Sequence, residues 1–304
     1  MADAPVVVVV GAASRDLVHD DTRGWRLGGG VSYAALTLAR LGLRVGALVG
    51  ADRLAAESRE LHLLRDSGVE VVVAPLLRGP VFINTETPTG RIQHAPQVSD
   101  PVEPSALPAG WRDAAGWLFG PVAAELPDAW ADVPRADALV SLGWQGLLRV
   151  LVAGEPVTQR PPDRSPIVAR ADLVGVGRDD VDPGTPEASL LGLLHPGATM
   201  LLTDGAAGGI ALDAGPGGSV VRRRAWSPIP VDRFVDPVGA GDTFLAGVFA
   251  ARIDPSLVAA GDGPDADLLV GAAAASLICE GPGLLGVPAR DAVLRRMHRA
   301  SGPG

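Results

Sequence analysis

The chain has 304 residues, of which 47% are hydrophobic, and its formal net charge at pH 7 is −9. This length and composition suffice for one large α/β domain, or two smaller ones, with an extensive buried core. The negative net charge argues against nucleic acid as the main partner, and the one basic run, Arg222–Arg224, is expected on a strand with a solvated edge. The single cysteine, Cys279, excludes an intrachain disulfide and any multi-cysteine metal site.

All 26 basic residues are arginine, because the sequence contains no lysine. This excludes a Walker-type phosphate loop, the ATP lysine of protein kinases, and Schiff-base or pyridoxal-phosphate chemistry, since each requires an amine. Any phosphate group that this chain binds must be neutralised by backbone N–H groups, arginine or a metal ion.

The sequence also favours a cytoplasmic protein without membrane contact. No apolar run approaches the length of a membrane span, and residues 1–4 lack the positively charged start of a secretory signal. A single cysteine is consistent with a reducing compartment.

Along the chain, strand and helix patterns alternate. Residues 6–10 are a β-branched run of the kind found in central parallel strands buried on both faces. The densely charged residues 14–27 are expected to leave the sheet as a loop or lid. A helix at 31–41, a strand at 44–49, a helix at 53–67 and a strand at 69–74 follow, which indicates a doubly wound sheet.

A second excursion is predicted at residues 78–98, as a hairpin with Pro88-Thr89-Gly90 at its tip. Further strands are predicted at 117–122, 138–142, 173–176, 199–203 and 209–212, and helices near 124–132, 145–153, 187–194, 240–252, 265–280 and 289–299. We therefore predict one α/β domain over residues 1–304 with a doubly wound, mainly parallel sheet, which residues 14–27 and 78–98 leave as excursions.

The most informative segment is V-D-P-V-G-A-G-D-T-F-L-A at residues 235–246, at the start of an apolar helix. Gly239, Ala240 and Gly241 would form the entering turn, whose N–H groups have no intrahelical partner and attract anions. Asp242 could reach a hydroxyl group beside such an anion. An anion site next to a base predicts phosphoryl transfer, with Asp242 accepting the hydroxyl proton. Taken alone, the G-A-G string is also compatible with an ordinary helix start.

Two strings resemble signatures of the ribokinase family of carbohydrate kinases, and they occur in the family's order. One is G-G-G-V-S-Y-A-A at residues 28–35, running to Leu41-Gly42, and the other is D-P-V-G-A-G-D-T-F at residues 236–244. The resemblance covers nearly the full chain. The Ser-Tyr-Ala-Ala form, the Asp-Pro variant and Q-G-L-L-R at 145–149 are similar to a subgroup that includes myo-inositol kinases. The resemblance implies a ribokinase-like fold, a three-layer αβα structure in which residues 14–27 and 78–98 form a small β lid. It also implies ATP-dependent phosphorylation of a hydroxyl group of a sugar or cyclitol.

Site residues follow from the same resemblance. Tyr33 stands where the family has an asparagine, which makes ribose a less expected substrate. Residues implied to bind substrate are Asp16, Gly28, Gly29 and Tyr33, and we add Asn84 in the lid strand and Arg149 as candidates. Residues implied to bind the nucleotide are Thr203, Gly205 and Gly208.

The metal-binding motifs of the family are only partly present in this sequence. Its Asn-x-x-Glu magnesium motif corresponds to G-R-D-D at residues 177–180, which leaves Asp180 as the candidate for Mg²⁺. A K⁺ ion beside the anion site would draw on Asp236 and the carbonyl group of Val238. The sequence does not set the oligomeric state: members of the family often form homodimers through the lid strands, and the apolar hairpin at residues 81–83 could serve in this way or could equally fold onto its own core.

Two alternatives to a sugar or cyclitol kinase stay open. One is a nucleoside kinase of the same fold. The other is a non-catalytic ligand-binding relative, which the altered magnesium motif allows. The retained Asp242 argues against the second alternative, because a protein that only binds has no need of a base.

Overall fold

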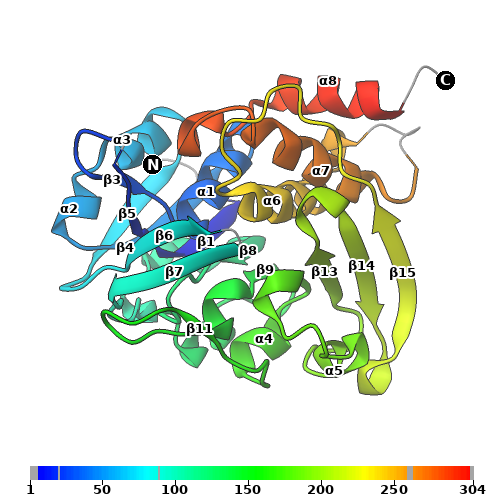
Figure 1. Ribbon diagram of the computed structural model, residues 1–304. Coiled ribbons are helices and arrows are strands. Elements are labelled where there is room, and N and C mark those ends of the chain that lie inside the picture. The colour runs from blue at the N-terminus through cyan, green and yellow to red at the C-terminus, as the bar shows by residue number, and fades with distance from the viewer. Residues whose placement is uncertain (1–5, 20, 88–89, 259–262, 302–304) are drawn as a thin grey trace.

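The computed structural model describes residues 6–19, 21–87, 90–258 and 263–301. Its central sheet has the strand order β15-β14-β13-β12-β9-β8-β1-β4-β5. The strands from β13 to β5 run parallel, and β14 and β15 extend the sheet as an antiparallel hairpin (Figure 1). The bounds are β1 Val7–Ala12, β4 Val45–Ala51, β5 Glu70–Pro75, β8 Gly116–Phe119, β9 Leu139–Gly143, β12 Leu173–Gly177, β13 Thr199–Thr203, β14 Gly209–Ala214 and β15 Val220–Trp226. The predicted mainly parallel α/β sheet is confirmed.

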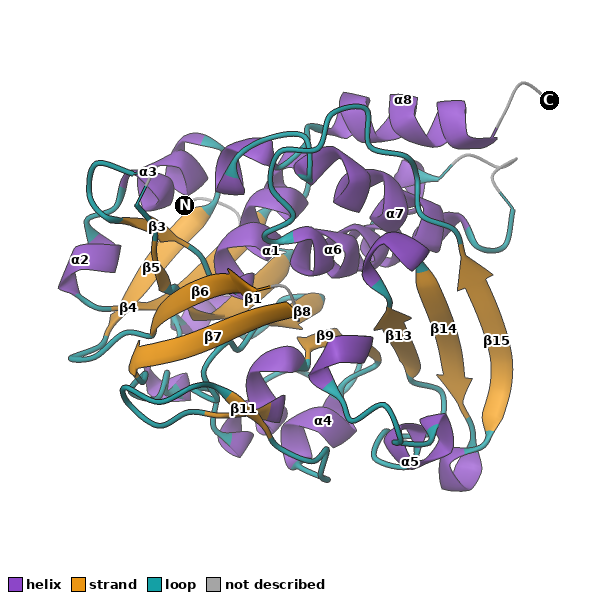
Figure 2. Ribbon diagram, in the orientation of Figure 1, coloured by secondary structure: helices purple, strands orange, loops and turns teal. Residues whose placement is uncertain are grey.

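Helices cover both faces of this sheet, as Figure 2 shows. In β1, Val7 and Val9 pack into one buried cluster, and Val8 and Val10 into a second cluster on the opposite face. This explains the continuous valine run at the start of the chain. Within the described ranges, no helix is both long and apolar enough to cross a membrane. The helices are α1 Gly30–Arg40, α2 Arg53–Ala56, α3 Arg59–Asp66, α4 Pro166–Arg170, α5 Glu187–Leu191, α6 Ala240–Ile253, α7 Ala266–Ile278 and α8 Arg290–Ser301.

The two predicted excursions combine into one small sheet with the order β3-β2-β6-β7. Its strands are β2 Arg15–Leu17, β3 Trp25–Leu27, β6 Val81–Thr87 and β7 Gly90–Gln97. β2 pairs with β6 in parallel, which joins the first excursion to the second. Phe82 and Ala95 pack against Val122 and Ala123 in the loop after β8, and this contact fixes the lid to the central sheet. Pro88 and Thr89 of the predicted turn lie outside the described residues.

Three helix predictions need correction. The helix predicted at 53–67 is two helices, because Asp52 and Ser58 each accept an N–H bond that starts a new helix. The predictions at 124–132 and 145–153 are wrong, since these segments contain only short 3₁₀ turns, Asp128–Asp132 and Gln145–Leu148. The second turn leads into β10 (Arg149–Val150), which pairs with β11 (Thr158–Gln159). Ala124 has a positive φ of 55°, which interrupts any helix through it.

Candidate active site

A cleft of about 350 Å³ opens between the lid and the carboxyl ends of the central strands, where doubly wound sheets usually bind ligands. It gathers segments that are far apart in the sequence, from the ends of β1, β12 and β13 to the start of α6. Gly28, Gly208 and Asp236 do not line it. The residues predicted from sequence that do line it are Asp16, Gly29, Tyr33, Asn84, Arg149, Asp180, Thr203, Gly205, Val238, Gly239, Ala240, Gly241 and Asp242.

The glycine turn before α6 is shaped for an anion. Gly239 has a φ of 81°, the left-handed region that favours glycine, and a Cβ atom there would lie 2.3 Å from the Tyr33 ring. Ala240 donates its N–H to the carbonyl of Pro237 at 3.1 Å, so this predicted amide is already engaged. Among the hydrogen bonds between described residues, none uses the N–H of Gly239 or Gly241. These two amides are the ones the turn offers to a ligand.

Asp242 lies in the first turn of α6 and faces the first residue of α1. A Cβ atom at Gly30 would be 2.8 Å from Oδ1 of Asp242, so glycine makes room for the carboxylate. Burial raises the pKa of Asp242 to about 6; the carboxylate of Asp180 acts in the same direction and the guanidinium of Arg149 opposes it. At neutral pH the group is ionised yet more basic than an exposed carboxylate, which suits a general base.

A pH profile should reveal this base. The active form is the carboxylate, so kcat/KM is expected to fall about tenfold per pH unit below pH 6 and to level off above pH 7. No histidine of the described chain lines the cleft, so the titration of Asp242 does not overlap with that of a cleft histidine. The measurement is kcat/KM between pH 5 and 8 at constant ionic strength. A flat profile across pH 5 to 7 would contradict the assignment.

Polar side chains line the cleft around Asp16. Ser14, which the sequence did not single out, donates its hydroxyl to Oδ1 of Asp16 at 2.9 Å. A Cβ atom at Gly28 would lie 2.3 Å from Oδ2 of Asp16, so Gly28 makes room for this carboxylate without lining the cleft. Across the lid, Gln93 donates its amide to Oδ1 of Asn84 at 2.8 Å, which orients that side chain. Ser14 and Gln93 both line the cleft and could bind hydroxyl groups.

Arg149, the first residue of β10, lines the cleft. It donates to the carbonyl of Val122 at 3.2 Å, and its guanidinium lies 5.7 Å from the centre of the Phe82 ring. Burial lowers the pKa of Arg149, and the carboxylates of Asp180, Asp242, Asp16 and Glu125 oppose this effect. The side chain is therefore a partly buried cation whose charge is felt by several acids, and it contacts the loop after β8 and the lid.

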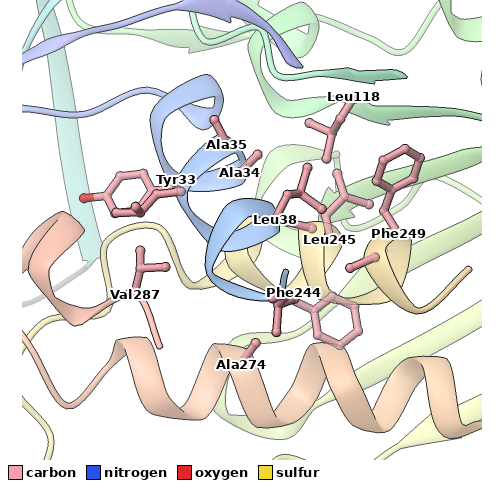
Figure 3. Packing of buried hydrophobic residues seen from close by; sticks show 14 of the residues in the cluster. Tyr33, Ala34, Ala35, Leu38, Leu118, Phe244, Leu245, Phe249, Ala274 and Val287 are labelled. Carbon is pink, nitrogen blue, oxygen red and sulfur yellow. The ribbon is translucent and has the colours of Figure 1, made fainter. Parts of the chain in front are cut away.

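Tyr33 connects α1 to the glycine turn. Its ring packs on Gly239, and Figure 3 shows its hydroxyl pointing away from Leu38 and Phe249 at the edge of the packed cluster. Burial, with the carboxylates of Asp16, Asp236 and Asp242, holds the pKa of Tyr33 well above its usual range. Tyr33 thus supports the turn as well as lining the cleft.

Asp180, Thr203 and Gly205, the residues expected on the phosphate-donor side, also line the cleft. Asp180 accepts a bond from the Gln145 amide at 2.8 Å and one from the Gly177 N–H at 3.1 Å. Among the residues described, no three His, Cys, Asp or Glu side chains gather as a metal site. One carboxylate still fits Mg²⁺, which commonly keeps several waters and binds mainly to substrate phosphates.

Gly208 is turned away from the cleft. A Cβ atom there would lie 2.3 Å from the carbonyl oxygen of Trp226, and the Trp226 ring stacks on Phe244 with centroids 4.6 Å apart. Arg178, which the sequence did not single out as a ligand, lines the cleft beside Gly205 and lies 3.4 Å from Asp204. In the described cleft lining, Arg149 and Arg178 are the two cationic side chains.

Asp236 lies behind the glycine turn. Its Oδ1 accepts the Val238 N–H at 3.0 Å, its Oδ2 accepts the Gly283 N–H at 3.1 Å, and Nη1 of Arg26 lies 4.0 Å from Oδ2. This donor set does not fit a K⁺ ion on Asp236, because a guanidinium group already lies beside the carboxylate.

Glu125 is a buried support of the cleft that the sequence did not reveal. Its side chain is 2% exposed, and its carboxylate accepts N–H bonds from Ala12, Val122 and Ala123 at 2.7 to 3.2 Å. Burial raises the pKa of Glu125 against the effect of these bonds. The carboxylate ties the end of β1 to the loop after β8, next to Ser14 and Arg149.

Replacing Glu125 with alanine is expected to lower the free energy of unfolding by about 3 kcal/mol or more, because three buried N–H groups lose their acceptor. Urea unfolding followed by circular dichroism measures the change. Glu103→Ala, at an exposed position nearby, is the matched control and should change stability by less than about 0.5 kcal/mol. Equal effects of the two substitutions would contradict the role of Glu125.

Comparisons with known proteins agree with this geometry. The sequence profile described as pfkB family carbohydrate kinase matches residues 176–289. No curated protein matches the chain. The fold is similar to that of a pyrophosphate-dependent kinase in the ribokinase family complexed with a pyrophosphate analog and myo-inositol, at 20% identity and a TM-score of 0.74, covering 94% of this chain and 98% of that one.

Two further structures share the fold. Arabidopsis thaliana ribokinase, complexed with ribose and ATP, is 20% identical, with a TM-score of 0.66 over 97% of this chain and 99% of that one. Methanocaldococcus jannaschii nucleoside kinase is 14% identical, with a TM-score of 0.64 over 97% and 99% of the two chains. The profile match spans the glycine turn and Asp242, and the fold covers the rest of the chain. On these grounds, the chain has a ribokinase-like fold, and its residues 176–289 match the pfkB family of carbohydrate kinases.

Proposed function

We propose that this kinase transfers the γ-phosphoryl group of ATP to a hydroxyl group of a small neutral polyol, a sugar or a cyclitol. The observation that supports this proposal most strongly is the position of Asp242. Its carboxylate lines the same cleft as the open amides of the glycine turn and the polar side chains around Asp16, and burial raises its pKa to about 6.

In this proposal the acceptor hydroxyl lies against Asp242, which takes its proton as the oxygen attacks phosphorus. The N–H groups of Gly239 and Gly241 hold the charge on the phosphoryl oxygens, and Arg149 and Arg178 supply the positive charge that lysine supplies elsewhere. Asp16, Ser14 and Asn84 accept or donate bonds to the remaining hydroxyl groups. When bound, Mg²⁺ would neutralise the donor phosphates, with Asp180 as its carboxylate contact.

The chemistry of the acceptor side favours a polyol over a nucleoside. Ser14, Asp16, Asn84 and Gln93 present hydroxyl, carboxylate and amide groups. The Phe82 ring is covered by the Arg149 guanidinium, so a base that stacked there would displace a buried cation. A nucleoside kinase, as in the M. jannaschii relative, is the second candidate.

The donor has a second candidate as well, because one similar structure is a pyrophosphate-dependent kinase. The observation that favours pyrophosphate is local: Gly208 is packed behind Trp226, which fills the space beside the β13–β14 turn. Only Thr203 and Gly205 of the three predicted nucleotide residues line the cleft. Pyrophosphate has no adenosine group, so it would occupy only the phosphate-binding part of the cleft.

A screen that varies both the acceptor and the phosphate donor tests the two assignments. Inositols, hexoses, pentoses and nucleosides are each incubated with ATP and Mg²⁺ or with pyrophosphate and Mg²⁺, and donor consumption is compared with an Asp242→Asn blank. We expect consumption with ATP and at least one sugar or cyclitol. Turnover with nucleosides alone would replace the acceptor assignment, turnover with pyrophosphate alone would replace the donor, and acceptor-independent consumption would contradict the proposal.

We further propose a homodimer through the lid. Ile83 and Ile92, on β6 and β7, are 37% and 45% exposed, which gives the lid an apolar surface. Light scattering should report a dimer for the wild type and a monomer for Ile83→Arg. A monomeric wild type at micromolar concentration would contradict this.

A further inference from the structure

The carboxylate of Asp236, behind the glycine turn, lies beside the guanidinium group of Arg26. Asp236 uses both oxygens to hold backbone N–H groups, Oδ1 at Val238 and Oδ2 at Gly283. It thereby ties the anion-binding turn to the 3₁₀ segment Gly283–Gly286 after α7. Oδ2 is also the oxygen that lies 4.0 Å from Nη1 of Arg26.

Arg26 reaches this carboxylate from the lid. It is the central residue of β3 and lies opposite Asp16 in the β2–β3 ladder, so the two side chains are on one face of the lid sheet. The charges of Asp16, Asp236, Asp242 and Arg26 all act on the pKa of the Tyr33 hydroxyl, the three carboxylates raising it and Arg26 lowering it.

We propose that Arg26 is the built-in cation of this site and stands in the place that the resemblance gives to a K⁺ ion. A guanidinium group is charged at every working pH, and a K⁺ ion on the same carboxylate would be repelled by it. The positive charge of Arg26 offsets the negative charge of Asp236. This reduces the repulsion between Asp236 and a phosphate anion bound on the other side of the turn. The kinase is therefore independent of monovalent metal ions, an inference that rests on the proposed function.

The test compares K⁺ with tetramethylammonium as chloride salts at equal ionic strength. Wild-type kcat is expected to be the same in both salts within about twofold, and its Tm the same within about 1 °C, because no ion binds to the folded state. A Tm or a kcat that rises with KCl beyond these limits would overturn the proposal. The Tm needs no turnover, so a wild type inactive on every acceptor would defeat the proposed function and still leave the K⁺ question answered.

Substitution of Arg26 tests the cation directly. Arg26→Gln should lower kcat by about tenfold or more, Arg26→Lys by less, and part of the lost activity should return with added guanidinium or K⁺. Arg53→Gln, at an exposed position on α2, is the control and should keep wild-type activity. Unchanged kcat in Arg26→Gln would overturn the proposal, as would a folded, impaired variant that neither cation rescues.

Discussion

Asp242→Asn is expected to lower kcat by about 10³-fold and to change KM for either substrate by only a few fold. Asparagine keeps the size of the side chain and its place in the first turn of α6, but it cannot accept the hydroxyl proton. Loss of a general base typically costs 10²- to 10⁴-fold. Steady-state kinetics with the acceptor found by the screen measures the effect, and Asp66→Asn, exposed at the end of α3, is the matched control.

The stability of the same variant separates catalysis from folding. The folded protein raises the pKa of Asp242 from 3.8 to about 6, so the ionised group costs free energy of folding above pH 6 and costs little below pH 4. Asp242→Asn removes this cost and should be more stable than wild type at pH 7, by about 1 to 3 kcal/mol. A variant that is inactive because it unfolds would show the opposite change, and wild-type kcat in a stable variant would refute the role of Asp242.

Gly239→Ala is expected to lower kcat by about 10²-fold. Alanine resists the φ of 81°, and its Cβ atom would lie 2.3 Å from the Tyr33 ring, so the turn must shift. A shift moves the amides of Gly239 and Gly241 away from the phosphoryl oxygens, and one misplaced donor of this kind costs about 10²- to 10³-fold. Kinetics and urea unfolding are measured together.

Gly68→Ala provides the matched control for Gly239→Ala. Gly68 has a φ of 88° after α3, far from the cleft, and a Cβ atom there meets nothing within 4 Å. Both variants should lose about 1 kcal/mol of stability or more from the backbone conformation, but only Gly239→Ala should lose activity. Equal kcat values for Gly239→Ala and wild type would contradict the assignment of the turn as the anion site.

The sheet and the turn could be predicted from sequence because each has a local cause. A valine run such as residues 7–10 predicts a strand that is buried on both faces of the sheet. The two excursions, one densely charged and one with a hairpin pattern, could be predicted to leave the core. The glycines before α6 signalled an anion site because the left-handed backbone angle found at Gly239 favours glycine.

Features that depend on long-range contacts could not be predicted in this way. The segment after β8 has a helical composition, yet Glu125 draws the N–H groups of Val122 and Ala123 to its carboxylate and Ala124 turns with a positive φ. Nothing in the sequence around Glu125 distinguishes a buried acid from an exposed one. The engaged amide of Ala240 and the pairing of Arg26 with Asp236 arise from the folded turn and from the lid, which the spacing of residues does not encode.

Mass spectrometry of the acceptor after reaction tests the central claim most directly. Wild-type enzyme, Mg²⁺ and ATP are incubated with the sugar and cyclitol panel, and each acceptor is examined for the gain of one phosphoryl group. The account predicts a phosphorylated sugar or cyclitol with wild type and none above background with Asp242→Asn over the same period. Phosphorylated product formed equally by both proteins, or no phosphorylated hydroxyl compound from the wild type with any donor, would contradict it.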